Sequence, residues 1–235
     1  DLVFNNQGLI DVSNGVLDLD ANYSAQVGST LLVEPSGVAN RGVGPLVLAA
    51  GTLAGDGVIR ADVQVDSVDV APGAGPGGLT INGSFSATSN TTYSMEIGGV
   101  APPQQINGSQ EKLPSAQYDR LTISGTALLD GTVNVLDIGY TPNLSDVFTL
   151  FAYANFSGSL ALGANPHAGF ALDLGATRTR YSTGTFPVCE WITGGSTNDW
   201  TDPLNWNNCS TGVGPGPGPV GTPGAPDRVL IAGGS

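Results

Sequence analysis

The chain has 235 residues, of which 40% are hydrophobic and 11% are charged, against roughly 25% charged residues in ordinary soluble domains. This composition excludes a disordered polymer, and the 35 glycines and 16 prolines leave no room for a long helix. The net charge of −13, with Lys112 as the only lysine, excludes a nucleic-acid-binding surface, because phosphate binding needs clustered Lys and Arg.

The acidic surface has two explanations. The excess of 20 acids over 7 bases would attract divalent cations, or it is a solvated coat that keeps a large β surface from aggregating, and we favour the coat. No apolar run approaches the roughly 18 residues of a membrane span. No signal peptide precedes the strand-like first residues, so we expect a mature form or a piece of a longer protein.

Residues 1–115 repeat a short unit made of a glycine, two or three apolar residues and a polar corner. Apolar and polar residues alternate at strand spacing, so one set of side chains is expected inside and the other in water. The predicted strands of this kind lie at 31–33, 46–48, 58–59, 63–65, 68–70 and 79–81. Recurrence every ~20–25 residues, without helices between the strands, predicts a parallel β-helix, or β-solenoid.

Residues 116–186 are expected to close this stack with a wider final coil or a small sandwich. Residues 100–114 are polar and contain proline, which predicts a loop that leaves the stack before this portion begins. Gly125 and Gly131 are expected at corners, because glycine lets the backbone reverse where a side chain would clash. Longer strands rich in aromatic residues are predicted at 119–124, 127–137, 146–153, 157–162 and 169–174.

Residues 187–235 are expected to form a small disulfide-linked module, a linker and a terminal strand. Cys189 and Cys209 are the only cysteines, and a bond between them would stabilise the module by roughly 3 kcal/mol and indicate an oxidising compartment. Two free buried thiols are the alternative. The Gly/Pro run at 212–219 predicts a semi-extended linker, and 229–231 predicts one more strand.

Three tryptophans of this module have two interpretations. Flat rings stack on sugar faces, so Trp191, Trp200 and Trp206 are a candidate glycan platform. More often such rings form a small core where aliphatic residues are few, and we favour that core.

Both ends of the chain have the pattern of strands without caps. An exposed end strand offers unpaired amides and apolar side chains to another chain. Either the sequence is a segment of a longer protein, or the last strand of one copy completes the first rung of the next, which gives a head-to-tail filament. The candidate assembly strands contain Leu2, Val3, Phe4, Val229, Leu230 and Ile231.

The stretch 118–160, with its Tyr-Asp-Arg-Leu, Gly-Thr-Ala-Leu-Leu-Asp-Gly-Thr-Val-Asn-Val and Phe-Thr-Leu-Phe segments, resembles the late passenger region of bacterial autotransporter-type β-helix proteins. Residues 71–83 are similar to a recurrent Pro-Gly turn of that family, and 200–206 with 226–231 look like a Trp/Asn-Trp module of large secreted bacterial surface proteins. The resemblance implies a right-handed parallel β-helix displayed outside the cell, in a family that is mostly structural or adhesive.

Candidates for catalysis are few. His167 is the only histidine, and no Gly-x-Ser-x-Gly elbow accompanies it, so a Ser-His-Asp site is not predicted. Asp62, Asp66 and Asp69 form the acid-richest stretch, and polysaccharide lyases and hydrolases on β-helices use such carboxylates. We favour the solvated face of one rung for these acids and predict that the protein is not an enzyme.

No cofactor is predicted. One histidine and two distant cysteines do not make the usual zinc ligand set. Calcium is an alternative at Asp18 and Asp20, or at Asp66 and Asp69, which lie on predicted turns with nearby carbonyl groups. Asn-x-Ser/Thr sequons, which arise by chance in so Asn-rich a chain, include Asn82, Asn90 and Asn155.

The sequence thus predicts a non-catalytic, extracellular β-solenoid that serves as a surface scaffold or as a self-assembling filament subunit joined head-to-tail. An adhesin or glycan-binding segment of a larger surface protein is the alternative, with glycans or host and neighbouring cell surfaces as partners. A polysaccharide lyase or hydrolase is the least favoured of these hypotheses.

Overall fold

The computed structural model describes residues 4–19, 23–103 and 116–183, and the backbone of three short strands at 188–191, 206–207 and 228–230. Every regular element among these residues is a β-strand, so the prediction of an all-β protein is confirmed. A search of the same residues finds no helix with the length and hydropathy of a membrane span. The chain divides into two compact units, Asp1–Ser182 and Thr183–Ser235, so the predicted division at residue 116 falls inside the first unit.

The strands of the first unit are short and follow one another closely, as a chain punctuated by glycine predicts. Each strand predicted above overlaps an observed strand of this unit. In chain order these are β1 (Phe4–Asn6), β2 (Leu9–Asp18), β3 (Tyr23–Ala25), β4 (Thr30–Asn40), β5 (Leu46–Leu48), β6 (Gly51–Gly55), β7 (Val58–Arg60), β8 (Val63–Val65), β9 (Val68–Pro72), β10 (Gly78–Ile81), β11 (Phe85–Ala87), β12 (Thr92–Ile97), β13 (Arg120–Leu128), β14 (Gly131–Asp137), β15 (Phe148–Ser157), β16 (Leu160–Leu162), β17 (Ala171–Leu174) and β18 (Arg178–Ser182).

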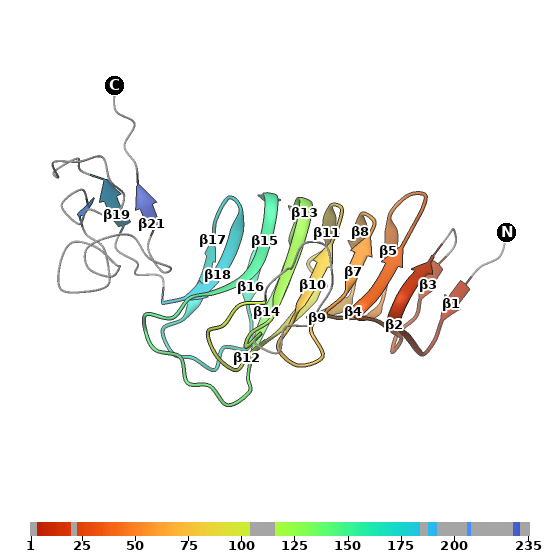
Figure 1. Cartoon of the computed structure of the whole chain (residues 1–235), viewed down its shortest axis with the longest axis horizontal. Coiled ribbons are helices and arrows are strands. Elements are labelled where there is room, and N and C mark those ends of the chain that lie inside the picture. Colours follow the sequence, from red (N-terminus) through yellow and green to blue (C-terminus); the bar gives the residue numbers. More distant parts are fainter. Residues whose placement is uncertain are drawn as a thin grey trace, which may run out of the picture. The chain divides into compact units, whose positions relative to one another are not determined.

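Three ladders of parallel strands make up most of the first unit (Figure 1). The first ladder is β2–β4–β6–β9–β12–β14–β16, the second is β2–β4–β7–β10–β13–β15, and the third is β5–β8–β11–β13–β15. β1 and β3 form a separate parallel pair. Paired residues in the early part of each ladder lie roughly 20 residues apart in the sequence, as the predicted repeat requires.

The long strands β2, β4, β13 and β15 each take part in two ladders, because they bend from one ladder into the next. Gly125 was expected at a corner and lies inside β13, where the register shifts between Ile123 and Thr126. Gly131 begins β14 with a φ of 117°, a conformation that side chains rarely adopt. Both glycines therefore stand where the chain changes ladder, and only Gly131 does so with a positive φ.

The core consists of apolar side chains that stack in register along each ladder. One stack of the first ladder contains Leu31, Leu53, Val70, Tyr93, Val133 and the partly buried Leu162, and one of the second contains Ala39, Ile59, Ile81, Ile123 and Tyr153. Residues between them along each strand face outward, which is the alternation that the sequence predicts. In-register stacking of large aliphatic groups is the main source of stability in such an arrangement.

The last strands of the first unit pair antiparallel, unlike the strands of the three ladders. β18 pairs antiparallel with both β15 and β17, so the second ladder ends in a hairpin where a wider coil or a sandwich was expected. The sequence analysis missed β18, because Arg178 and Arg180 interrupt its apolar character. Thr179 and Tyr181, which alternate with these arginines, are fully buried.

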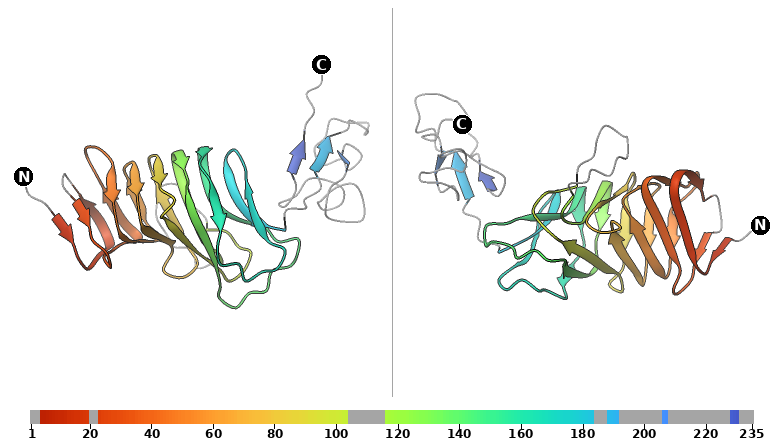
Figure 2. Two further views of the ribbon diagram at one scale, coloured as in Figure 1. Left: turned by 180° about the vertical axis from the view of Figure 1, so that it is seen from behind. Right: turned by 60° about the horizontal axis from the view of Figure 1, so that its bottom comes forward.

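Aromatic rings fill the core at this end. The ring of Phe148 packs against Tyr118, Tyr140, Phe170 and Tyr181, with centroid distances of 5.4 to 6.4 Å. Phe170 is the last residue of the segment between β16 and β17, and it is only 5% exposed. This segment and the hairpin therefore cover the aromatic end of the core; two further views of the same strands are given in Figure 2.

The described part of the second unit is a three-stranded sheet in the order β20–β19–β21. Its strands are β19 (Val188–Trp191), β20 (Trp206–Asn207) and β21 (Arg228–Leu230). β21 overlaps the predicted terminal strand, 229–231, and runs parallel to β19, whereas β20 runs antiparallel to it.

Candidate functional site

The acids Asp62, Asp66 and Asp69 each bind a residue of the next repeat and do not share a partner. Asp62 accepts a hydrogen bond of 2.7 Å from the Ser84 backbone N–H, and Asp69 accepts one of 2.9 Å from the Ser94 hydroxyl. Asp66 accepts hydrogen bonds from the side chains of Thr88 and Asn90. All of these partners lie one repeat later in the sequence, so the carboxylates link successive repeats of the stack.

A second group of acids lies in the corner between the first and second ladders. Asp119 accepts hydrogen bonds from the backbone N–H groups of Gly77 at 2.9 Å and Glu96 at 2.8 Å. Asp56 accepts one of 2.9 Å from the N–H of Gly78. Gly77 fits only as glycine, because a Cβ atom there would lie 1.5 Å from Asp56 Oδ1.

Burial is the main cause that raises the pKa of Asp119 to about 8; the nearby carboxyls of Glu96 and Asp56 act in the same direction, and its two backbone hydrogen bonds act in the opposite direction. The side chain is 1% exposed. The sequence analysis did not single out this residue, since a carboxylate between a buried tyrosine and an arginine is ordinarily taken as an outward-facing group.

The raised pKa of Asp119 predicts that the chain loses stability as the pH rises from about 4 to about 8. Below the ordinary pKa of aspartate both states hold the proton, whereas between these values only the folded state does. Melting temperatures measured across this range should therefore fall with pH in the wild-type chain, and the slope should be smaller in Asp119→Asn. The absolute melting temperature of this variant is expected to be lower, because an amide cannot accept both backbone N–H groups.

Asp66→Asn is the control for this measurement. Hydrogen bonds from Thr88 and Asn90 hold the pKa of Asp66 below its usual value, so that group titrates at lower pH and the variant should keep the wild-type slope. A slope that is the same in the wild-type chain and in Asp119→Asn would contradict the prediction.

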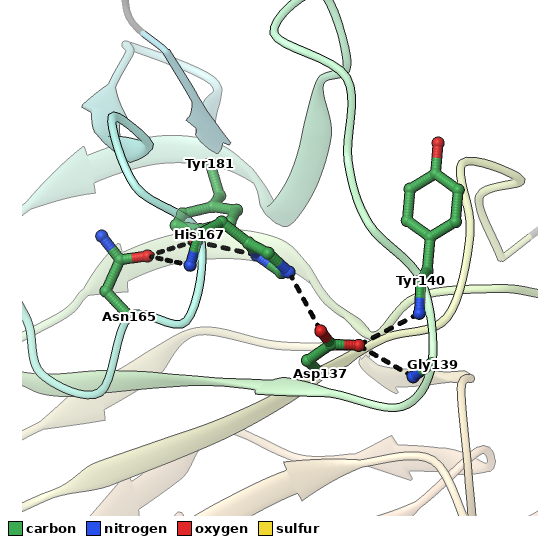
Figure 3. A network of polar contacts seen from close by, with 6 residues as sticks. All are labelled: Asp137, Gly139, Tyr140, Asn165, His167 and Tyr181. Carbon is green, nitrogen blue, oxygen red and sulfur yellow. Dashed lines mark hydrogen bonds and ion pairs between the residues drawn. The ribbon is translucent and has the colours of Figure 1, made fainter.

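The structure brings His167 next to a carboxylate and a hydroxyl (Figure 3). His167 lies in the segment between β16 and β17, and its Nε2 is 3.6 Å from Oδ2 of Asp137, the last residue of β14. Its Nδ1 is 3.1 Å from the hydroxyl of Tyr181 in β18, which also bonds to Asn165. Three regions distant in sequence thus meet at the one histidine of the chain.

Charge and burial differ across this cluster. His167 is 8% exposed, whereas the side chain of Asp137 is 38% exposed. Hydrogen bonds from the N–H groups of Gly139 and Tyr140, at 2.8 and 3.0 Å, hold the pKa of Asp137 below its usual value. Burial raises the pKa of Tyr181 to about 12. The cluster therefore pairs an ionised, solvent-accessible carboxylate with a buried imidazole and a neutral phenol.

The tryptophans and cysteines of the predicted module are described only in part. Trp191 in β19 stands opposite Trp206 in β20, and Cys189 stands opposite Val229 in β21. Trp200 and Cys209 lie outside the described residues, so the disulfide and the glycan platform stay predictions.

The predicted assembly strands are also described only in part. Phe4 is 50% exposed at the start of β1, and β21 contains Val229 and Leu230. Leu2, Val3 and Ile231 lie outside the described residues.

The predicted calcium sites do not acquire a ligand cluster in the part of the chain that the structure describes. Asp18 accepts a hydrogen bond of 2.6 Å from Asn40, and Asp20 lies outside that part. No group of three or more His, Cys, Asp or Glu side chains suited to a metal ion occurs among the described residues. The sequon residues Asn82, Asn90 and Asn155 are all exposed.

Comparison with protein-family models and with curated proteins finds no match for this chain.

Proposed function

We propose that the chain is a right-handed parallel β-solenoid that serves as a non-catalytic structural element outside the cell, either a surface scaffold or a filament subunit. The observation that carries the proposal is the set of three parallel ladders, each of which receives one strand from nearly every repeat of the sequence. A chain that visits three ladders in turn and returns to the first builds one coil upon another. Such a stack is stiff, because each coil is bonded to two others along its length.

The carboxylates support a mechanical role in the same way. Asp62, Asp66 and Asp69 each accept a hydrogen bond from the next repeat of the sequence. These hydrogen bonds give each carboxylate a structural role within the stack. A structural function therefore accounts for the acid-rich stretch better than a lyase or hydrolase does.

An extracellular location is supported by composition. The chain has few charged residues, and its polar surface consists largely of Ser, Thr and Asn. A bond between Cys189 and Cys209 would belong in an oxidising compartment. Counting thiols in the denatured, unreduced protein tests this point, and two free thiols would remove the argument.

Stacking of one copy upon another is supported by the exposed surface of the first strands. β2 pairs only with β4 among the described strands, which leaves its other edge open, and Leu9 and Val16 on it are 64% and 58% exposed. An open edge with exposed apolar residues is a template for pairing with another strand. At the other end of the first unit, Phe170 and Tyr181 are buried. The open edge of β2 is therefore proposed as one side of the joint between copies.

Negative-stain microscopy together with light scattering of the purified chain tests this assembly. We expect species larger than a monomer, and we expect Val16→Lys to return the chain to monomers, because a charge on the open edge opposes strand pairing. Ser13→Lys, which places the same charge at an exposed position at the bend of β2, is the control for net charge. If the unmodified chain is a monomer, stacking between copies is contradicted. The surface scaffold is then the structural role that remains.

A glycan-binding adhesin is the second candidate. The observation that favours it is the placement of Trp191 opposite Trp206 across two paired strands. A glycan array tests the idea, and binding that Trp206→Ala abolishes would support it. Absence of binding to neutral and acidic glycans would contradict the adhesin hypothesis.

A further inference from the structure

His167 has one ring nitrogen whose hydrogen-bonding capacity the described residues do not use. The imidazole packs between the rings of Phe170 and Tyr181, with both centroid distances at 5.9 Å. Its Nε2 is buried and takes part in no hydrogen bond within the described part of the chain. A buried polar atom in this condition calls for a missing partner.

The hydrogen bonds around Asn165 determine which nitrogen of His167 carries the proton. Asn165 Nδ2 donates to the carbonyl of Phe170 at 2.9 Å, and its Oδ1 accepts the backbone N–H of His167 at 3.2 Å, so the orientation of the amide is fixed. The Tyr181 hydroxyl donates its single hydrogen to the same Oδ1. Tyr181 must therefore accept from His167, which places a proton on Nδ1; in the neutral imidazole Nε2 then carries the lone pair.

The lone pair of Nε2 faces a carboxylate. Asp137 Oδ2 is 3.6 Å from Nε2, while Asp137 Oδ1 is held by the N–H groups of Gly139 and Tyr140. While the imidazole is neutral, two electron-rich atoms placed in this way repel each other unless a metal ion lies between them. Zinc binds imidazole nitrogen and carboxylate oxygen at about 2.0–2.2 Å, so donors at this separation can share one ion.

We propose that His167 Nε2 and Asp137 Oδ2 are ligands of a divalent transition-metal ion of the zinc type, with water in the remaining positions. The exposed side of Asp137 gives such an ion access from solvent. The hydrogen bond from Nδ1 to Tyr181 fixes the ring and its tautomer, as the outer partners of metal-bound histidines do. Imidazole with carboxylate favours zinc, copper or nickel over calcium or magnesium.

The bound ion would tie the segment between β16 and β17 to the end of β14. This segment covers the aromatic end of the core through Phe170. Binding to the folded state alone raises stability in proportion to the occupancy of the site. The ion would thus strengthen the covered end of the first unit.

Nitrogen NMR of the imidazole tests the proposal directly, because an untagged chain contains one histidine. In metal-free protein at alkaline pH we expect the Nδ1–H tautomer. Addition of zinc should shift the Nε2 resonance, with half-saturation below about 1 mM zinc. An Nε2–H tautomer, or an imidazole that responds to pH and not to zinc, would overturn the proposal.

Thermal melting with three variants supplies a second test. Zinc should raise the melting temperature of the unmodified chain, while calcium and magnesium at the same concentration should not. Asp137→Asn keeps the acceptor for the two backbone N–H groups and removes the ligand charge, so it should lose the zinc response; His167→Gln should lose it as well. Asp66→Asn, which removes a carboxylate remote from histidine, should retain it. A zinc response that persists in Asp137→Asn would also overturn the proposal.

Discussion

Replacing Phe85 with alanine is expected to lower the free energy of unfolding by about 3–5 kcal/mol. Phe85 lies in the middle of the third ladder, where it pairs with Val63 on one side and Ala127 on the other, and it is 1% exposed. Its ring also contacts that of Tyr93 at a centroid distance of 6.5 Å. Because the small side chain of Ala127 cannot fill the space, most of the cavity should remain. Urea unfolding of the full chain measures the effect.

Ser86→Ala is the matched control, since Ser86 follows Phe85 in β11 and faces the other way. Its pairing partners Gln64 and Leu128 are exposed, so loss of the hydroxyl should change the free energy of unfolding by less than about 0.5 kcal/mol. Equal losses in the two variants would contradict the alternation of inward and outward residues along this ladder. That alternation is the basis of both the fold and the proposed function.

The repeating strands could be predicted because each carries its information locally. Val63 and Val65, for example, flank Gln64. The two valines are buried and the glutamine is exposed, as the alternation of apolar and polar residues in the sequence predicts. The same period recurs after every polar corner, so strand positions follow without knowledge of which strands pair. The all-β class could be predicted from this local pattern alone.

The hairpin at the end of the first unit could not be predicted in this way. In β18 the outward positions hold Arg178 and Arg180, and the inward positions hold Thr179 and Tyr181. A threonine and a tyrosine between two arginines give no apolar signal. What buries them is contact with β15, a strand some distance earlier in the chain, and this contact is visible only in three dimensions.

The candidate sites lay beyond the sequence for a similar reason. His167 and Asp137 are about 30 residues apart and meet because β14 ends beside the segment that follows β16. Asp119 is recognisable as a buried group only once the backbone amides of Gly77 and Glu96 are placed around it. Counting ligand types in the sequence does not show which carboxylate faces the histidine.

Gly131→Ala is expected to cost more than about 4 kcal/mol in the free energy of unfolding, or to prevent folding. Two effects add at this position. The φ of 117° is strained for any residue with a side chain, and a Cβ atom would lie 2.2 Å from the carbonyl oxygen of Thr91. That oxygen accepts the hydrogen bond of Thr132, so it cannot move aside without breaking the pairing of β12 with β14.

Gly75→Ala separates the two effects, because Gly75 has a φ of 109° with nothing within 4 Å of an added Cβ. Strain alone should cost about 1–3 kcal/mol there. The additional loss of unfolding free energy in Gly131→Ala then measures the contact with the preceding strand. Equal losses in the two variants would mean that the strands are not packed as closely as described. Gly55 and Gly158 also have positive φ and would meet the carbonyl oxygens of Val33 and Leu129. Recurrence of this contact indicates that the fixed spacing between parallel strands, about 4.8 Å, selects glycine at the corners.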